Sequence, residues 1–354
     1  MSDPELRSST PLDPRKLRAG LTITIAIGVT VGVGVALATG GREVLAGMAK
    51  LNVAWLLLAL ALSGLSWLGQ GLGFAALKPR GVHTNLLRMT SAFLGGDFAA
   101  LVTPFGSGGI PVGVFCLTRE GLTAGESSAI IAMHSLLTGL FFLVVGAVAA
   151  IVMPLKTKGA ETIMWSGLAA IAVVLAFVVW LAARPHAAKD RLNRLFSGAW
   201  LKRALGARRA ERFAAAVDRE ATQFARDLRT LTHERPSHLA LSFFGLFMSR
   251  VCLVVCLPVV MLGLGWRGDI APLLATAVGA MALMIVSPTP GGSGAVEVAT
   301  AALLSTQPGV SGPMAGAATL LWRGVTYYTE VIAGWLLFTR YLATKPRSSE
   351  APRG

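Results

Sequence analysis

Long apolar runs alternate with short polar connections along the whole chain. The apolar segments lie at about 19–38, 53–77, 84–118, 124–153, 162–183, 238–264, 270–305 and 316–341. Several of them exceed the ~18 residues that mark a membrane-spanning helix. The pattern therefore predicts an all-α polytopic membrane protein that begins with a polar tail, residues 1–18.

The composition supports this interpretation. Of the 354 residues, 54% are hydrophobic and 14% are charged, and the mean hydropathy is +0.64. A soluble domain carries roughly 25% charged residues. We therefore expect membrane lipids as the main partners.

Basic residues set the expected orientation, because cytoplasmic loops carry an excess of Lys and Arg. We expect the tails at 1–18 and 342–354 and the loop at 184–237 to be cytoplasmic. Residues 184–238 contain 13 Lys or Arg and 6 Asp or Glu. Their excess of seven positive charges is half of the net charge of +14. The part at 198–232 is predicted to be an amphipathic helix on anionic lipid; a polar linker is the alternative. We expect no nucleic-acid partner.

Two apolar segments do not fit as simple spans. With both termini inside, 84–118 must start and end inside, and 270–305 must start and end outside. Each is therefore predicted to be a re-entrant helical hairpin, and the two hairpins enter from opposite sides. The other segments give about six spanning helices.

Both hairpins break at nearly the same string of residues. Thr103–Gly108 reads TPFGSG and Thr289–Gly294 reads TPGGSG, so five of six positions agree. Interrupted helices at corresponding positions of inverted repeats are typical of transporters. Chance is the alternative, because 40 of the 354 residues are glycine.

The predicted organisation follows from this repeat. The first membrane repeat covers 19–153. A short external loop and the first span of the second repeat cover 154–183, and the rest of the second repeat covers 238–341.

The two breaks are the first candidate site. Proline and glycine free backbone groups from the helix, and the N-terminus of each new half-helix favours an anion such as a phosphate-bearing headgroup. A hairpin that merely packs tightly is the alternative. The candidate residues are Thr103, Pro104, Gly106, Ser107 and Gly108 in the first break, and Thr289, Pro290, Gly292, Ser293 and Gly294 in the second.

Ionisable residues expected inside the membrane, away from the ends of the apolar segments, are the second candidate group, because each is costly in a bilayer. They are Asp97, His134, Arg250, Glu297, Arg323 and Glu330. A cavity with Arg250 and Arg323 would suit a phosphate, and Glu297 or Glu330 would neutralise the arginines when it is empty, or carry a coupling proton.

Structural roles remain open for several of these residues. Arg323 and Glu330 are seven residues apart, on one face of a regular helix, where they would form an ion pair. His134 would be a hydrogen-bonded core histidine, and Asp97 would cap backbone at the first hairpin.

Signatures of soluble enzymes are missing from the sequence. It contains no Walker loop and no His/Cys spacing typical of a metal site, and GGSG lacks the strand–helix context of a dinucleotide motif. We therefore expect neither an enzyme nor a metal or cofactor.

Three stretches resemble a known family. TPFGSGGIPVGVFCLTREGLTAGESSA, SPTPGGSGAVEVATAALL and LLWRGVTYYTEVIAGW are similar to the lysylphosphatidylglycerol synthase transmembrane region, a flippase-like family, over roughly residues 20–342. Members fused to a soluble aminoacyltransferase make and translocate aminoacylated phosphatidylglycerol. This sequence lacks that domain, so the resemblance implies the flippase-like region alone. It points to Pro290–Glu297 and Arg323 as functional positions.

These observations predict a flippase-like transporter in the cytoplasmic membrane. It would translocate a polar or anionic phospholipid headgroup without ATP hydrolysis. The alternatives are a transporter of a small soluble anion and a membrane component of a glycolipid or hopanoid pathway. The oligomeric state stays open, with a homo-oligomer as one alternative.

Overall fold

The computed structural model describes residues 41–49, 51–79, 81–152 and 236–343, together with the single positions 30, 34, 165, 168, 169, 172, 173, 175 and 176. Almost all of the predicted spans at 19–38 and 162–183, almost all of the basic loop, and nearly all of both tails lie outside the described residues. The predictions made for them stay predictions.

All elements in the described ranges are helical. They are α2 (Arg42–Ala49), α3 (Val53–Leu77), α4 (Leu86–Leu101), η2 (Pro104–Gly106), α5 (Gly109–Arg119), α6 (Ala124–Val152), α11 (Pro236–Gly263), α12 (Ala271–Val286), η4 (Pro290–Gly292), α13 (Ala295–Ser305), α14 (Gly312–Arg323), η5 (Gly324–Tyr328) and α15 (Thr329–Ala343). The bounds agree with the apolar segments to within a few residues, and both predicted breaks are present. The short helix α2 was not predicted.

Three of these helices are long and apolar enough to cross a membrane. They cover Val53–Leu77, Ala124–Val148 and Pro236–Gly263. Shorter apolar helices cover Gly109–Arg119 and Ala271–Met284. The fold class is therefore an all-helical membrane protein in the described ranges.

The chain divides into two compact units, each assembled from both halves of the sequence. Unit 1 contains Met1–Ser66, Leu94–Gly113 and Val251–Leu342, and unit 2 contains Trp67–Phe93, Val114–Arg250 and Ala343–Gly354. Neither unit coincides with a predicted repeat, because residues of both predicted repeats contribute to each unit.

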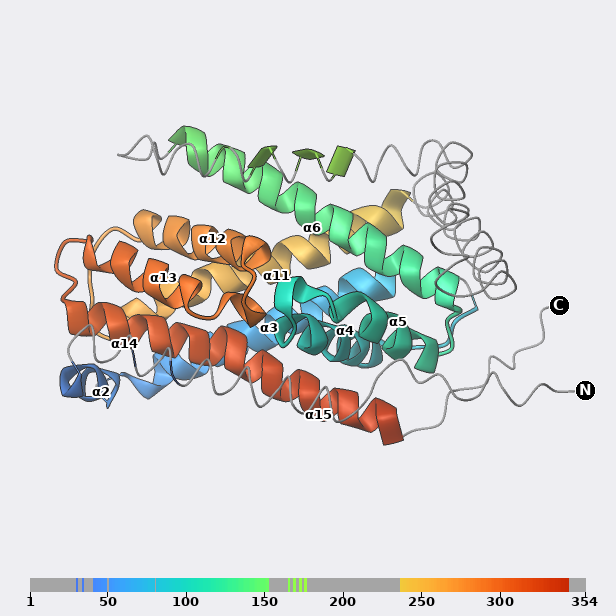
Figure 1. The fold of residues 1–354 in the computed structure, drawn as a ribbon, viewed down its shortest axis with the longest axis horizontal. Helices are drawn as coiled ribbons and strands as arrows, with labels where there is room; N and C mark the ends of the chain where they lie inside the picture. Colours follow the sequence, from blue (N-terminus) through green and yellow to red (C-terminus); the bar gives the residue numbers. More distant parts are fainter. Residues whose placement is uncertain are drawn as a thin grey trace, which may run out of the picture. The chain divides into compact units, whose positions relative to one another are not determined.

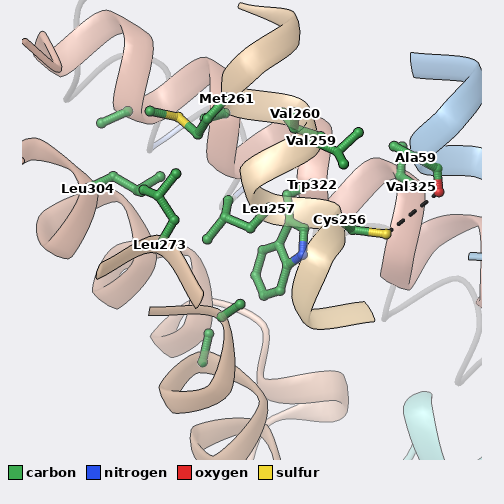
Figure 2. Packing of buried hydrophobic residues seen from close by; sticks show 14 of the residues in the cluster. Ala59, Cys256, Leu257, Val259, Val260, Met261, Leu273, Leu304, Trp322 and Val325 are labelled. Atoms are coloured by element: carbon green, nitrogen blue, oxygen red, sulfur yellow. Dashed lines mark hydrogen bonds between the residues drawn. The ribbon is translucent and has the colours of Figure 1, made fainter. Parts of the chain in front are cut away.

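In unit 1, α12, α13 and α14 lie side by side, and α2 packs on α14 (Figure 1). Buried apolar side chains of α12, α13 and α14 form one cluster with α11 (Figure 2). Leu257, Leu273 and Leu304 in this cluster are fully buried. The Cys256 thiol donates to the carbonyl oxygen of Ala59 over 3.6 Å. This core holds the second hairpin in place.

The first broken segment doubles back on itself. In unit 1, α4 and α5 approach so closely that a Cβ on Gly96 would lie 2.8 Å from the Cα of Gly113. In unit 2, the Arg88 guanidinium lies 3.9 Å from the Glu120 carboxylate. The two ends of the segment are therefore neighbours, as in a hairpin.

The second broken segment also doubles back. Helices α12 and α13 pack against each other, and the residues that flank them meet: the Trp266 indole N–H donates to the carbonyl oxygen of Pro308 over 3.1 Å. The element lengths match those of the first hairpin. Each has a 16-residue helix, a 3-residue turn and an 11-residue helix.

Contacts also fix the relative directions of the long helices. In unit 2, Gly69 of α3 contacts Gly245 of α11, and the Ala76 carbonyl oxygen lies 2.9 Å from Nδ1 of His238. Because the residue order is reversed between the two helices, α3 and α11 run antiparallel, which agrees with their predicted directions.

Candidate functional site

The two TPxGSG breaks have the same turn over their first four residues and then differ, because ψ is -25° at Ser107 and 131° at Ser293. Thr103 and Thr289 are extended, and the third residue of each string is left-handed: Phe105 has φ 53° and ψ 20°, and Gly291 has φ 57° and ψ 20°. The same two hydrogen bonds close each turn, from Gly106 and Ser107 in one break and from their counterparts in the other. The likeness of the two strings is therefore structural.

The two breaks differ in burial. At the first, Pro104, Phe105 and Ser107 are exposed. At the second, Gly291, Gly292 and Ser293 are buried. Both breaks belong to unit 1, and η2 contacts η4, so the two hairpin tips meet. The sequence alone did not settle that contact.

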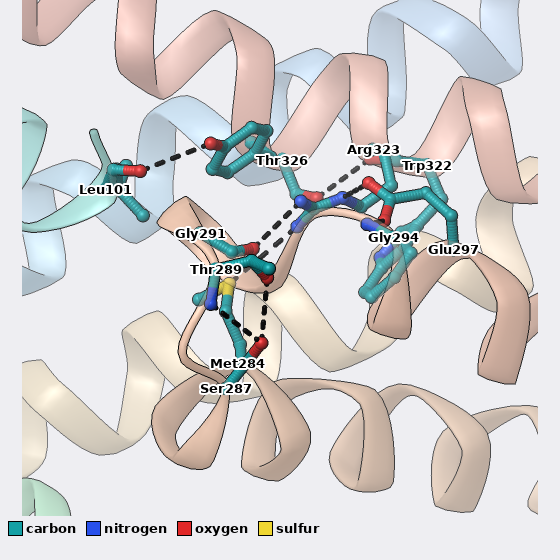
Figure 3. A network of polar contacts seen from close by, with 11 residues as sticks. Leu101, Met284, Ser287, Thr289, Gly291, Gly294, Glu297, Trp322, Arg323 and Thr326 are labelled. Atoms are coloured by element: carbon teal, nitrogen blue, oxygen red, sulfur yellow. Dashed lines mark hydrogen bonds and ion pairs between the residues drawn. The ribbon is translucent and has the colours of Figure 1, made fainter. Parts of the chain in front are cut away.

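A buried ion pair stands at the second tip (Figure 3). Nε of Arg323 lies 2.7 Å from Oε1 of Glu297, and the two side chains are 2% and 1% exposed. The other carboxylate oxygen, Oε2, accepts the Gly294 N–H over 2.7 Å. Removing two charges from solvent is favourable only when geometry and further hydrogen bonds are good, and here both conditions hold.

The guanidinium of Arg323 also holds the backbone of the break. Nη2 donates to the Gly291 carbonyl oxygen over 2.9 Å, and Nη1 lies 3.7 Å from the Met284 sulfur. One arginine thus binds a carbonyl oxygen within the break and a carboxylate in the first turn of α13.

Tyr327 connects the two tips. Its hydroxyl donates to the carbonyl oxygen of Leu101, at the end of α4, over 3.2 Å. Its ring lies under Arg323, with Cζ 3.9 Å from the ring centroid, and a Cβ on Gly291 would lie only 2.1 Å from the ring. Sequence reasoning did not single out Tyr327, although its position one helical turn after Arg323 signals a shared face.

Three further polar groups surround the ion pair without a hydrogen-bond partner in the described structure. They are Oγ of Ser293, Oγ1 of Thr300 and the indole N–H of Trp322, all buried. Buried polar groups are nearly always hydrogen-bonded. The surroundings of Glu297 and Arg323 can therefore accept additional polar ligand atoms.

The expected anion sites at the half-helix N-termini are partly occupied by the chain itself. At α13, Glu297 is the anion that accepts the Gly294 N–H. At α5, Oγ1 of Thr103 accepts the Gly108 N–H over 2.8 Å. An external anion at either position would meet these intramolecular acceptors.

The remaining ionisable residues lie elsewhere. Asp97 is half-buried on α4 in unit 1, and Glu330 is half-buried at the start of α15. Between Arg323 and Glu330 the chain forms the π-helical turn η5, so the regular α-helical spacing that put both on one face does not hold. Arg323 pairs with Glu297.

His134 and Arg250 belong to unit 2. The His134 ring stacks edge-on against Phe74, with centroids 5.0 Å apart, and the Arg250 guanidinium lies 5.6 Å from the Phe142 centroid. The predicted joint action of Arg250 and Arg323 on one phosphate remains a prediction.

The comparison with known families agrees with the expectation from the quoted motifs. The family model of the lysylphosphatidylglycerol synthase TM region matches residues 23–334, which include both hairpins and the ion pair. The chain belongs to this family. A lysylphosphatidylglycerol synthase TM-region protein is a membrane protein, as the apolar helices also indicate.

A relative of this family member is known from an archaeon. A UPF0104 membrane protein of Archaeoglobus fulgidus is 25% identical over 283 residues, which are 79% of this chain and 80% of the relative. The similarity thus extends over most of both chains.

Proposed function

We propose that the protein is a flippase-like transporter that moves an anionic phospholipid headgroup across the cytoplasmic membrane without ATP hydrolysis. The observation that carries this proposal is the contact between the two hairpin tips, one of which holds the buried Glu297–Arg323 pair. In transporters with inverted repeats, substrates bind where discontinuous helices meet near the bilayer midplane.

The proposed binding step is an exchange of anions. In the empty site, the Glu297 carboxylate neutralises Arg323. A phosphate oxygen of the headgroup takes the place of this carboxylate on the guanidinium, whose planar fork suits phosphate. The hydroxyls of Ser293 and Thr300, which lack partners in the described structure, then donate to the phosphate or to the released carboxylate.

The first tip favours a lipid over a small soluble anion. Phe105 and Ile110 at this tip are 71% and 62% exposed. In a membrane protein such an apolar surface suits acyl chains better than the wall of a closed aqueous pore. The headgroup would occupy the polar second tip while the acyl chains stay in the bilayer.

In this proposal the two inverted repeats rock against each other, so that the site opens alternately to each side of the membrane. Both hairpins are re-entrant and both termini are cytoplasmic in this arrangement. The equal element lengths of the two hairpins and the adjacent ends of each support this arrangement. The reciprocal contact of Gly69 with Gly245 supports it too, because such self-complementary contacts occur at two-fold axes.

The test is transport of headgroup-labelled phosphatidylglycerol in reconstituted vesicles. The wild-type protein should equilibrate the label between leaflets faster than protein-free vesicles do, and Glu297→Gln should abolish the gain. Glu120→Gln is the matched control, because Glu120 lies 3.9 Å from an arginine that is 40% exposed, and it should transport normally. Equal rates with and without wild-type protein would refute the proposal.

The same vesicles, loaded with radiolabelled inorganic phosphate, distinguish the soluble-anion alternative. Release of phosphate without lipid movement would replace the lipid by a soluble substrate.

A further inference from the structure

Unit 2 contains a second group of buried polar side chains, which the proposed headgroup site does not use. We call it the seam: Trp67 and Gln70 on α3, His134 on α6 and Ser242 on α11. All four lie within apolar helices, and Gln70, His134 and Ser242 are 3%, 6% and 0% exposed. The three helices meet at Gly73 of α3, because a Cβ there would lie 3.3 Å from Nδ1 of His134 on α6 and 3.4 Å from the Ser242 carbonyl oxygen on α11.

Five buried polar atoms of the seam have no hydrogen-bond partners in the described structure. They are the Trp67 indole N–H, Oε1 of Gln70, both ring nitrogens of His134 and Oγ of Ser242. An apolar side chain at each position would avoid the desolvation cost of an unsatisfied polar group. Ionisable residues in this environment are functional candidates by default, and a state in which water reaches the seam would satisfy all of these atoms.

The contacts of α6 are those that are easiest to separate. Between α3 and α11 the backbones touch: a Cβ on Gly69 would lie 2.6 Å from the Gly245 carbonyl oxygen. Helix α6 instead meets its neighbours through ring contacts, including Phe141 on Phe247 and Arg250 on Phe142. Opening of the seam would therefore separate α6 from the α3–α11 pair.

We propose that His134 is a proton-binding site, and that its protonation opens the seam between α3, α6 and α11. A protonated imidazole has two N–H donors and no acceptor, so it requires two acceptors. Gln70 and Ser242 each carry an acceptor that has no partner in the described structure, and water entering the open seam supplies more.

The positive charge of Arg250 explains how protonation of His134 would separate the helices. Arg250 on α11 is close enough for Coulomb interaction with the imidazole, whereas the α3 and α4 residues that contact the ring, Gly73, Phe74 and Phe93, are uncharged. A proton on His134 places a second positive charge on the helix facing Arg250. Repulsion between these two cations favours separation of α6 from α11.

This inference goes beyond the proposed headgroup site, since it concerns other residues in the other unit. A histidine in contact with water titrates near pH ~6.5, so the imidazole binds its proton at mildly acidic pH once water has entered the open seam. If transport is also shown, the proton site supplies a coupling ion for it.

The experiment measures reactivity of a buried cysteine with a water-soluble thiol reagent in detergent micelles. Ser242→Cys is placed in a background in which the three free cysteines, Cys116, Cys252 and Cys256, are alanine. Its rate is divided by that of Ser305→Cys, an exposed position on α13, at each pH, because thiolate content itself changes with pH. Thr319→Cys, at a fully buried position, reports general loosening.

At pH ~8 we expect the normalised rate to be roughly ten- to a thousandfold below that of an exposed cysteine, since minor states are populated at about 0.1–10%. At pH ~5 it should rise about tenfold or more, because the water-exposed imidazole of the open seam binds a proton and stabilises that state, while Thr319→Cys stays unreactive.

Two histidine variants test whether His134 causes the pH dependence of the labelling rate. His134→Gln should abolish the pH dependence. His238→Gln should keep it, because His238 is bonded to the Ala76 carbonyl oxygen outside the seam. A rate independent of pH, or a pH dependence that persists in His134→Gln, overturns the proposal.

If Ser242→Cys fails to fold, Gln70→Cys takes its place with the same expectations. Because labelling requires no transport, a failure here leaves the headgroup proposal standing. A failed lipid assay likewise leaves the proton site standing.

Discussion

The Glu297–Arg323 pair gives the sharpest test of the structure. Both side chains are almost fully buried, and the N–O distance is 2.7 Å. Removing one partner of such a pair leaves an uncompensated buried charge and costs about 3–5 kcal/mol. We therefore expect Glu297→Gln and Arg323→Met each to lower the free energy of unfolding by this amount, or roughly two to three and a half powers of ten in the equilibrium constant.

The double variant should be less destabilised than either single variant, because it contains no unpaired charge. Apolar replacement of a whole buried pair is often neutral or stabilising by about 1–4 kcal/mol. The assay is equilibrium unfolding in mixed dodecyl maltoside–SDS micelles, analysed as a double-mutant cycle.

A matched control comes from the Arg88–Glu120 pair. Its N–O distance is 3.9 Å, and the Arg88 and Glu120 side chains are 40% and 9% exposed. Because water still reaches the arginine, Glu120→Gln should cost clearly less than loss of either partner of the buried pair. Equally small losses in the single variants at the buried pair, or free-energy losses that add in the double variant, would show that Glu297 and Arg323 do not form a buried ion pair. The proposed anion exchange would then lose its basis.

Three further changes probe the packing around the tips by the same unfolding assay. Gly291→Ala should lower the free energy of unfolding by about 1–3 kcal/mol through overlap with the Tyr327 ring, and strain at φ +57° adds to this loss. Phe105→Gly at the same turn position should cost nothing, because it relieves about 1–2 kcal/mol of left-handed strain. Equal losses in the two variants would disprove the equivalence of the turns. Gly334→Ala should lower the free energy of unfolding by about 1–3 kcal/mol, because its Cβ would overlap the α4 backbone. Gly279 faces open space, so Gly279→Ala should raise the free energy of unfolding by up to about 1 kcal/mol. Similar changes in both variants would contradict the packing of α15 on α4. Tyr327→Phe should cost about 1 kcal/mol for the lost hydrogen bond between the tips, and an unchanged midpoint would show that this bond is not formed.

Much of the hairpin structure followed from the sequence, because proline and glycine dictate local backbone. The strings beginning at Thr103 and Thr289 predicted two breaks, and both are present with the same turn over their first four residues. Apolar runs predicted the long helices for a similar reason, since a continuous run of 25 residues has few alternatives to a helix.

The pairing within the site was not predictable in this way. The sequence left Glu297 and Glu330 open as partners of Arg323, and helical spacing favoured Glu330. The ion pair is formed with Glu297, 26 residues earlier. Two causes contribute. The π-helical turn Gly324–Tyr328 interrupts the regular spacing, and packing of α13 on α14 is a tertiary contact that periodicity does not encode.

The reciprocal contact of Gly69 and Gly245 has a consequence for how such a protein evolves. Under the proposed inverted repeat, the chain corresponds to an antiparallel homodimer whose two subunits have been joined in one gene. A homodimer must carry the same residue at both copies of every position. A joined chain has no such constraint, and its tips have diverged to Phe105 in one and Gly291 in the other. Under the proposed function, fusion allows one copy to specialise in binding the polar headgroup while the other contacts the acyl chains.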